Sequence, residues 1–375
     1  MAGIYIHIPF CKSRCIYCDF FTSTNEAEMD NYVQSLCLEI VHRRDEVAND
    51  TIRTIYFGGG TPSRLHQRHF ESVFEVINAN YTLADEVEIT IESNPDDLTH
   101  EYVDMLRVLP FNRISIGIQS FDDQELKFLS RRHDSQRAIE AVKYCQEKGF
   151  HNISIDLMYG LPKQTLAIWK KTLHQALQLD IQHISAYHLI YEEKTCLYSL
   201  LQAGKVNAVD EDASLEMFEV LINTLKDAGF MHYEISNFAK PNFISQHNSS
   251  YWTGQKYLGF GPSAHSFDGE HRWWNVSSMS KYIEGVNSSK PDIEMEDIDL
   301  ITKYNEYIIT GLRTMWGINL EELDKRFGKE LYDYFLSNAQ RYFNLNYLIK
   351  EDSNVVLTHK GIFISDGIMS DLMKV

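Results

Sequence analysis

Between residues 3 and 188, short runs rich in β-branched residues alternate with longer segments in which apolar residues recur every three or four positions. The short runs predict strands at residues 4–8, 51–57, 86–92, 112–118, 151–157 and 182–189. The longer segments predict helices at residues 27–47, 66–79, 99–107, 134–148 and 165–178. Strands that alternate with helices indicate successive βαβ units and a parallel sheet. Six such units predict an α/β fold built on a partial (β/α)6 barrel, whose functional loops gather at the carboxyl ends of the strands.

The pattern changes twice beyond the predicted barrel. A helical segment at residues 211–228 is followed by a region rich in aromatic residues and glycine, which continues to about residue 275. From about residue 297 a helix at residues 329–343 precedes two short strand-like runs, which is typical of a winged helix. Pro291 falls in a stretch, SSKPDIEMED, that has the composition of a linker. We therefore expect a core barrel over residues 1–230, an α/β extension over 231–290 and a small winged-helix-like domain over 297–375.

Composition and charge restrict the classes of protein to which this chain can belong. Hydrophobic residues make up 44% of the 375 residues and charged residues 23%, as in ordinary globular proteins. A net charge of −18 argues against a nucleic-acid partner, because phosphate binding needs a positive surface. The first residues, MAGIYIHIPF, lack the features of a signal peptide, and no apolar run reaches the roughly 18 residues of a membrane span. We expect a cytoplasmic protein without stable membrane insertion.

Three of the six cysteines lie in the segment CKSRCIYCDF, where Cys11, Cys15 and Cys18 follow the first strand with the spacing C-x3-C-x2-C. A structural zinc site needs a fourth ligand, and the candidate is His7. A redox pair formed by Cys15 and Cys18 leaves Cys11 unexplained. A four-iron cluster held by three thiolates leaves one iron open for a small ligand, which makes Phe20, in place of a fourth cysteine, a functional feature. The other three cysteines are expected to be buried small apolar residues: Cys37, Cys145 and Cys196.

Polar motifs follow the later strands. The glycines of GGGTP (58–62) permit either a tight turn or close approach of the backbone to a ligand, and the absence of G-K-[ST] excludes a phosphate loop. Glu92 ends the third strand, where its carboxylate is placed to accept hydrogen bonds from ribose hydroxyls. Gln119, Arg131 and Asp156 follow the fourth and fifth strands. Taken alone, Arg131 also fits a solvated helix-end cation and Asp156 a structural cap.

The cysteine spacing, with the aromatic Tyr17 just before the last cysteine, resembles the signature of radical S-adenosylmethionine (SAM) enzymes. This resemblance implies a [4Fe–4S] cluster whose open iron binds SAM, and reductive cleavage of SAM to a 5′-deoxyadenosyl radical. YIHIPFC, GGGTP, IESNP, GIQSF and IDLMYGLPKQT are similar, in order and spacing, to the oxygen-independent coproporphyrinogen III oxidase family. This second resemblance implies one or two SAM sites lined by Tyr5, Tyr17, Gly59, Gly60, Thr61, Glu92, Gln119, Arg131, Asp156 and, with a more divergent local sequence, Ile190.

Two departures distinguish the chain from the oxidase. The oxidase motif continues to a fourth cysteine, where this chain has Phe20, and the oxidase carries a long arm ahead of its cluster, whereas Cys11 is close to the first residue here. Both departures match the HemW-type haem chaperones, a sister group. HNSSYW (247–252) is similar to that group's H-N-x-x-Y-W signature, which makes His247 a candidate haem ligand and His265 a weaker one. The alternative for His247 is a hydrogen-bonded structural histidine.

The resemblance therefore implies a haem chaperone that binds haem and transfers it to an unidentified acceptor protein. Oxidative decarboxylation of coproporphyrinogen III to protoporphyrinogen IX is the enzymatic alternative, and whether the chain consumes SAM or only binds it stays open. A zinc-stabilised interaction protein is disfavoured by the matched SAM loops. A haem-degrading radical methyltransferase is a lesser alternative.

Overall fold

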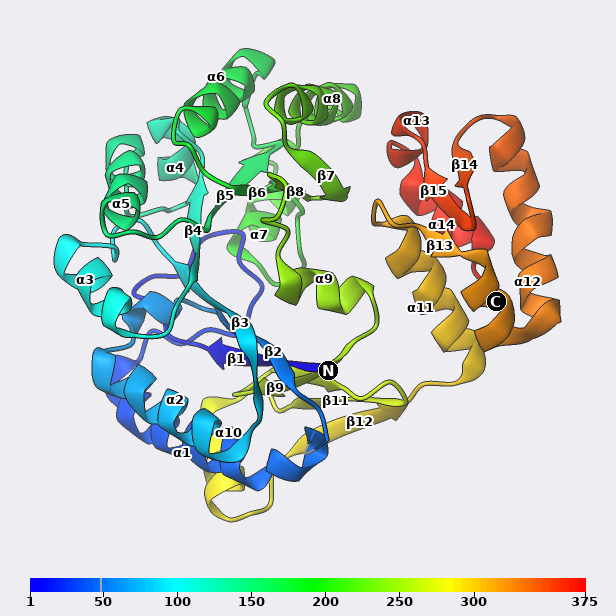
Figure 1. Ribbon diagram of the computed structural model, residues 1–375. Coiled ribbons are helices and arrows are strands. Elements are labelled where there is room, and N and C mark those ends of the chain that lie inside the picture. The colour runs from blue at the N-terminus through cyan, green and yellow to red at the C-terminus, as the bar shows by residue number, and fades with distance from the viewer. Residues whose placement is uncertain (48) are drawn as a thin grey trace.

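The computed structural model of the chain describes residues 1–47 and 49–375. An open barrel forms its centre, in which six parallel strands lie side by side in chain order (Figure 1). These strands are β1 (Ala2–Ile8), β2 (Ile52–Gly59), β3 (Leu83–Ser93), β4 (Arg113–Gln119), β5 (Ile153–Tyr159) and β6 (His183–His188). Helices on the outside of the barrel are α1 (Met29–His42), α2 (Gln67–Asn80), α3 (His100–Val108), α4 (Asp123–Phe128), α5 (Ser135–Glu147) and α6 (Leu166–Leu177). The predicted partial (β/α)6 barrel is confirmed.

The two faces of the barrel strands differ in polarity. In β1, Ile4 and Ile6 are fully buried in the apolar layer shared with the helices, while Tyr5 and His7 alternate with them on the concave face. The same alternation places a set of polar side chains on the concave face of the other strands: Thr54, Glu88, Glu92, Arg113, Ser115, Ser154, Asp156, His183 and Ser185. Parallel strands with both faces in an apolar core read as continuous hydrophobic runs. The alternation therefore marks a polar barrel interior.

The sheet extends beyond both edges of the barrel to a total of twelve strands among the described residues. At one edge β8 (Asn237–Ala239) pairs antiparallel with β6, and β7 (Met231–Glu234) pairs antiparallel with β8. At the other, β9 (Lys256–Phe260) pairs with β1 and is followed by β10 (His265–Phe267), β11 (His271–Asn275) and β12 (Ile293–Asp297). The remaining helices of this part are α7 (Cys196–Gln202), α8 (Glu211–Asp227), α9 (Gln246–Trp252) and α10 (Met279–Asn287).

The stretch expected to be a linker is partly a strand. Residues 293–297 form β12, which pairs with β11 in an antiparallel register from His271 opposite Asp297 to Asn275 opposite Ile293. Backbone pairing and the ion pair between Arg272 and Glu296 hold this acidic segment in the sheet. The composition of a solvent-exposed edge strand resembles that of a linker, which is why the sequence pattern did not separate the two.

The C-terminal part has a hydrophobic core of its own, formed by residues between Tyr304 and Leu372, whereas the barrel core runs from Ala2 to Val286. Its elements are α11 (Leu300–Leu312), β13 (Ile318–Asn319), α12 (Leu320–Asn344), β14 (Leu348–Glu351), β15 (Asn354–Leu357), α13 (His359–Ile362) and α14 (Ser365–Leu372). The helix expected at residues 329–343 is the second half of α12, which kinks at Gly328 (φ 80°). These helices lie beside the barrel with a three-stranded sheet, in agreement with a winged-helix-like fold (Figure 1).

Two expectations about smaller features differ from the structure. The short helices α4 and α7 had no counterpart in the sequence prediction, because six or seven residues are too few to show a helical period. Cys145 is buried as expected and Cys37 half-buried, but Cys196 is exposed. Cys196 is the first residue of the surface helix α7, and the next residue, Leu197, is the one that packs into the apolar cluster beneath this helix. None of the described helices combines the length and apolar character required to cross a membrane.

Candidate cofactor site

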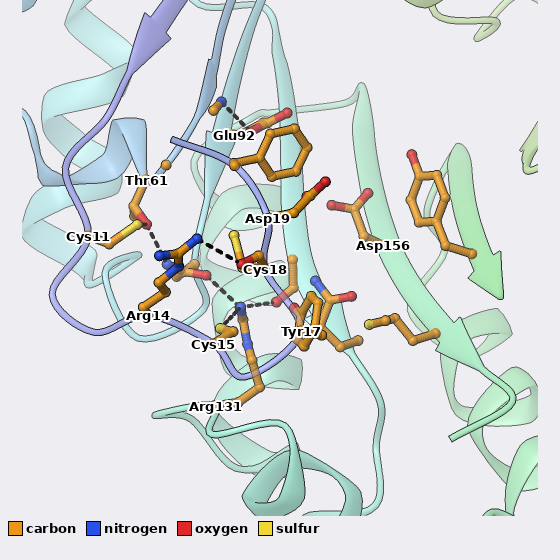
Figure 2. A pocket seen from close by; sticks show the side chains of 18 of the residues that line it. Cys11, Arg14, Cys15, Tyr17, Cys18, Asp19, Thr61, Glu92, Arg131 and Asp156 are labelled. Carbon is orange, nitrogen blue, oxygen red and sulfur yellow. Dashed lines mark hydrogen bonds between the residues drawn. The ribbon is translucent and has the colours of Figure 1, made fainter. Parts of the chain in front are cut away.

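The three cysteines lie on one loop after β1, at the carboxyl ends of the barrel strands (Figure 2). Backbone hydrogen bonds fix the base of the loop, since the Cys11 amide donates to the Ser23 carbonyl at 2.9 Å and the Ser23 amide to the Pro9 carbonyl at 2.7 Å. Ile16 packs with an apolar cluster around Met158 and Leu197 that holds the tip. Backbone pairing at the base and the packing of Ile16 at the tip thus anchor the loop. Cys11, Cys15 and Cys18 all line a cavity of about 470 Å³.

The glycine loop after β2 lies beside Cys11. Gly59 has a φ of 103°, and a Cβ there would lie 2.4 Å from Nδ1 of His7. A Cβ on Gly60 would lie 2.8 Å from the carbonyl oxygen of Ile8. Both positions therefore require glycine. The next residue, Thr61, places its Oγ1 3.3 Å from the Cys11 sulfur, so that the glycine loop and the cysteine loop form adjoining walls of the cavity.

Two of the carboxyl groups that line the cavity, those of Glu92 and Asp156, come from the barrel strands β3 and β5. The Tyr56 hydroxyl donates to Oε1 of Glu92 at 2.7 Å, and the Gly59 amide donates to Oε2 at 3.1 Å. Burial nevertheless raises the pKa of Glu92 to about 7. Burial also raises the pKa of Asp156 to about 6, although the Ser115 hydroxyl donates to it at 3.3 Å. These carboxyls provide acceptors for hydroxyl groups and a negative potential that favours a cationic ligand.

Arg131 is held against the cysteine loop. Its guanidinium donates to the Cys15 sulfur at 3.4 Å, to the Gly117 carbonyl at 2.6 Å and to the side chain of Asn94. Its Nε is buried and has no hydrogen-bond partner among the described residues. A buried donor without a partner is costly, which is consistent with a ligand group at this place. The alternative reading of Arg131 as a solvated helix-end cation is wrong.

Gln119 ends β4 in a left-handed conformation with a φ of 71°, which is uncommon for a residue with a side chain. This backbone turn lets the side chain of Gln119 line the cavity. Strained residues of this kind cluster at functional sites. The sequence contains no signal for the conformation of Gln119.

The cavity brings together most of the residues singled out from the sequence. Its lining includes Cys11, Cys15, Tyr17, Cys18, Gly59, Gly60, Thr61, Glu92, Gln119, Arg131, Asp156 and Ile190. Ile190 lies at its rim with 63% of its surface exposed, and Phe20 is 59% exposed there. Tyr5 is the SAM candidate outside this lining: it packs deeper in the barrel, stacked on Tyr56 at 6.2 Å.

Sequence reasoning did not single out several lining residues. Asn94 links Arg131 to Thr61 through its side-chain amide, and it lies in the IESNP motif only two residues beyond Glu92. The IESNP motif could therefore have identified Asn94 as a residue of the site. Tyr187 and His188 reach the cavity from the end of β6, where the sequence has no recognisable motif.

His247 lies in the barrel interior, outside the cavity. It is 1% exposed, its Nδ1 is 2.8 Å from Oγ1 of Thr54, and its Nε2 is 2.9 Å from the Tyr251 hydroxyl. Its ring also stacks on Tyr56 at 4.9 Å. Burial lowers the pKa of His247 to about 3, so the ring is neutral. This is the geometry of a hydrogen-bonded structural histidine, and haem ligation by His247, which would require both hydrogen bonds to break, stays a prediction.

The geometry also bears on the zinc alternative. His7, the candidate fourth ligand, has Nε2 2.9 Å from the Phe21 carbonyl and Nδ1 3.1 Å from the Tyr5 hydroxyl. Both ring nitrogens are thus in use. Among the described residues, no three His, Cys, Asp or Glu side chains converge on a point that a single metal ion could occupy. Cysteines that hold an iron–sulfur cluster bind separate iron atoms and need no such convergence.

Residues 5–176 match the Radical SAM superfamily, and residues 298–364 match the HemN C-terminal domain. The heme chaperone HemW of Bacillus subtilis is 33% identical over 98% of each chain, and that of Lactococcus lactis is 31% identical over 98% of this chain and 96% of the relative. The chain belongs to the HemW family.

The fold of this HemW-family chain also resembles a solved structure. Coproporphyrinogen III oxidase (HemN) from Escherichia coli superimposes with a TM-score of 0.86, covering 100% of this chain and 90% of the oxidase at 22% identity. This likeness shows the fold alone.

Membership of the radical SAM superfamily implies a [4Fe–4S] cluster and SAM as cofactors. The residues present fit both groups: three thiols and the side-chain-free Gly59 and Gly60 line one cavity, and a buried Arg131 nitrogen has no hydrogen-bond partner among the described residues.

Proposed function

We propose that this chain is a haem chaperone, which binds haem and transfers it to an acceptor protein. The observation that carries the proposal is a three-cysteine loop over a cavity lined by Glu92, Arg131 and Asp156, in a chain that matches proteins named heme chaperone HemW along almost its full length. The acceptor is a protein of unidentified sequence, and neither nucleic acid nor stable membrane insertion is part of the proposal. We place the protein in the cytoplasm.

In this proposal Cys11, Cys15 and Cys18 hold the [4Fe–4S] cluster, and SAM occupies its open iron. The residues proposed to line the SAM site are Tyr5, Tyr17, Gly59, Gly60, Thr61, Glu92, Gln119, Arg131, Asp156 and Ile190. The cluster supplies an electron and an open coordination position when it is bound. The cofactors belong to the proposed core barrel at residues 1–230, while the extension at 231–290 and the domain at 297–375 flank it.

The chain's own groups give the amino acid moiety and the ribose of SAM chemically matched partners. Gly59 and Gly60 line the cavity without side chains, and we assign their backbone groups to the amino acid moiety. Glu92 is placed to accept hydrogen bonds from ribose hydroxyls, with its orientation fixed by Tyr56 and the Gly59 amide. The guanidinium of Arg131 favours a carboxylate near the cysteine loop, because an arginine donates several hydrogen bonds from a fixed plane.

Oxygen-independent coproporphyrinogen III oxidation is the second candidate, favoured by the similarity of the whole fold to the E. coli oxidase. The resemblance places the fourth cysteine of the oxidase motif at Phe20. In this chain Phe20 is largely exposed at the rim of the cavity. The fourth cysteine of the oxidase motif is thus absent from this chain, as it is in the HemW-type chaperones, which favours the chaperone.

One pair of experiments separates the candidates. Cluster-reconstituted protein is incubated without oxygen with SAM, reductant and coproporphyrinogen III, and the products are read by mass spectrometry. The same preparation is titrated with ferric haem and followed by absorbance. We expect unchanged porphyrinogen together with saturable haem binding. Protoporphyrinogen formed alongside 5′-deoxyadenosine would establish the oxidase instead, and the absence of saturable haem binding would contradict the chaperone.

A further inference from the structure

A second cavity, of about 740 Å³, lies between the extended sheet and the C-terminal helices. One wall comes from α9 and strands β9 to β11, and the other from α11, α12 and the segment between them. Six aromatic side chains line it: Tyr251, Trp252, Tyr257, Phe267, Tyr307 and Trp316. Cavities of this size accept drug-sized or cofactor-sized ligands. We call this cavity the interdomain cleft.

The strand register explains why the sheet wall is aromatic. In β10, Ser266 is buried and bonded to Arg43, so its neighbours His265 and Phe267 lie on the opposite face, towards the cleft. The register places Trp274 opposite His265 and Arg272 opposite Phe267 on that same face. Trp274 stacks on the imidazole of His265 with centroids 5.3 Å apart. The result is a wall of aromatic rings that presents one imidazole and one guanidinium.

His265 differs from His247 in what its ring can do. His265 is exposed, and no hydrogen bond to its ring occurs among the described residues, whereas both nitrogens of the buried His247 are bonded. Partial desolvation of the ring and the nearby Arg272 lower the pKa of His265, which favours the neutral imidazole that binds metals. Of the two histidines, His265 is therefore the one whose ring is available to an iron atom.

Cationic groups lie around the same cleft. Arg272 is paired with Glu306 at 3.0 Å and with Glu296 at 3.3 Å, and Lys303 is paired with Glu270. Arg326, from the opposite wall, is paired with Glu322 at 3.0 Å and lies over the ring of Tyr307. An arginine offers five N–H donors, so a ligand carboxylate can share or replace these partners.

We infer that the interdomain cleft is the haem-binding site and that His265 is a ligand of the haem iron. This inference rests on the proposed haem-chaperone function and says where the haem binds. The aromatic walls match the flat macrocycle, the exposed imidazole matches the iron, and Arg272, Lys303 and Arg326 match the two propionates. No lining residue is shared with the cavity under the cysteine loop.

The test titrates the full-length protein with ferric haem and records the Soret band and the quenching of tryptophan fluorescence. Trp252, Trp274 and Trp316 lie in or beside the cleft, so haem bound there quenches them. We expect His265→Ala to shift the Soret maximum and to weaken haem binding by about tenfold or more. His271→Ala is the matched control, because His271 lies on neighbouring β11, pairs with Asp268 and does not line the cleft.

A second variant tests the cleft independently of the iron ligand. Thr310 is a small cleft-lining residue on α11, and Thr310→Trp would fill part of the volume. We expect weaker haem binding with an unchanged circular dichroism spectrum and unchanged cluster absorbance. An unaltered Soret band and affinity in His265→Ala would overturn the ligand, and unaltered affinity in Thr310→Trp would overturn the cleft. If the wild-type protein binds no haem, the proposed function itself fails.

Discussion

Glu92 shows how a single residue reconciles folding with ligand binding. Two hydrogen bonds orient its carboxyl group, yet burial keeps its pKa near 7. The ionised form is thus disfavoured in the protein without ligand. A cationic sulfonium compound such as SAM would favour the carboxylate, so ligand binding would lower this pKa.

This raised pKa predicts a pH-dependent effect of Glu92→Gln. The folded protein holds a proton on Glu92 up to about pH 7, whereas the unfolded chain releases it near the ordinary value of 4.5. Stability contributed by Glu92 therefore falls as pH rises between these two values. We expect Glu92→Gln to raise the melting temperature of the cofactor-free protein by a few °C at pH 8 and by less at pH 5. Calorimetry at both pH values measures this, and SAM binding by the variant should be weaker.

Asp156→Asn provides the comparison. The pKa of Asp156 is raised to about 6, so the destabilisation that its ionisation causes reaches its full size at a lower pH than for Glu92. A stabilisation by Glu92→Gln that is equal at pH 5 and pH 8 would contradict the assigned shift.

His247 provides the second prediction at this scale. Replacement by Ala removes the buried partner of both Thr54 and Tyr251 and leaves a cavity beneath α9. We expect His247→Ala to lower the free energy of unfolding by about 2–4 kcal/mol. Denaturant titration measures this, with His271→Ala, a partly exposed histidine on β11, as the control. An unchanged free energy of unfolding in His247→Ala, together with an altered Soret band of its haem complex, would instead identify His247 as a haem ligand.

At the scale of the elements, the sequence pattern predicted every barrel strand to within a few residues, because β-branched runs and turn residues are local signals. The position of the site followed from the topology, since loops at the carboxyl ends of parallel strands meet. The pattern could not show that α9 inserts His247 between Thr54 and Tyr251, because that contact joins segments 193 residues apart. Nor could it show the left-handed turn at Gln119 or the pairing of β12, which depend on neighbours distant in sequence.

The glycine loop after β2 leads to a prediction at the scale of the elements, because its backbone conformation positions the cavity wall beside Cys11. Gly59→Ala puts a methyl group against the ring of His7 and places a side chain at a φ of 103°, which costs about 1–2 kcal/mol in strain alone. We expect lower cluster occupancy and loss of SAM binding, measured by iron and sulfide analysis and by equilibrium dialysis. Gly149→Ala is the matched control: its φ of 84° gives comparable strain, but nothing lies within 4 Å of the added Cβ. Equal loss of cluster in both variants would show a general loss of stability instead.

At the scale of the whole molecule, the C-terminal domain is joined to the barrel sheet by backbone hydrogen bonds. The Ile235 amide donates to the Arg313 carbonyl at 3.1 Å, and the Met315 amide donates to the Tyr233 carbonyl at 2.9 Å. Arg313 also lies over the ring of Trp252 at 5.5 Å. These contacts position the two walls of the interdomain cleft, while the cysteine loop lies at the carboxyl ends of the barrel strands and uses none of these residues.

Separate cavities predict separable cofactors. Replacement of Cys11, Cys15 or Cys18 by Ala should abolish the visible absorbance of the cluster, because each thiolate is proposed to hold one iron. Haem affinity should stay within about twofold of the wild type, since the cleft shares no residue with that cavity. Cys145→Ala is the control, as this cysteine is buried within the apolar core. Iron and sulfide analysis tests the loss of the cluster, and haem titration of the same preparations tests the retention of haem affinity. Retained iron and sulfide would refute the cluster ligands, whereas haem binding lost together with the cluster would place the haem at the cysteine loop and not in the cleft.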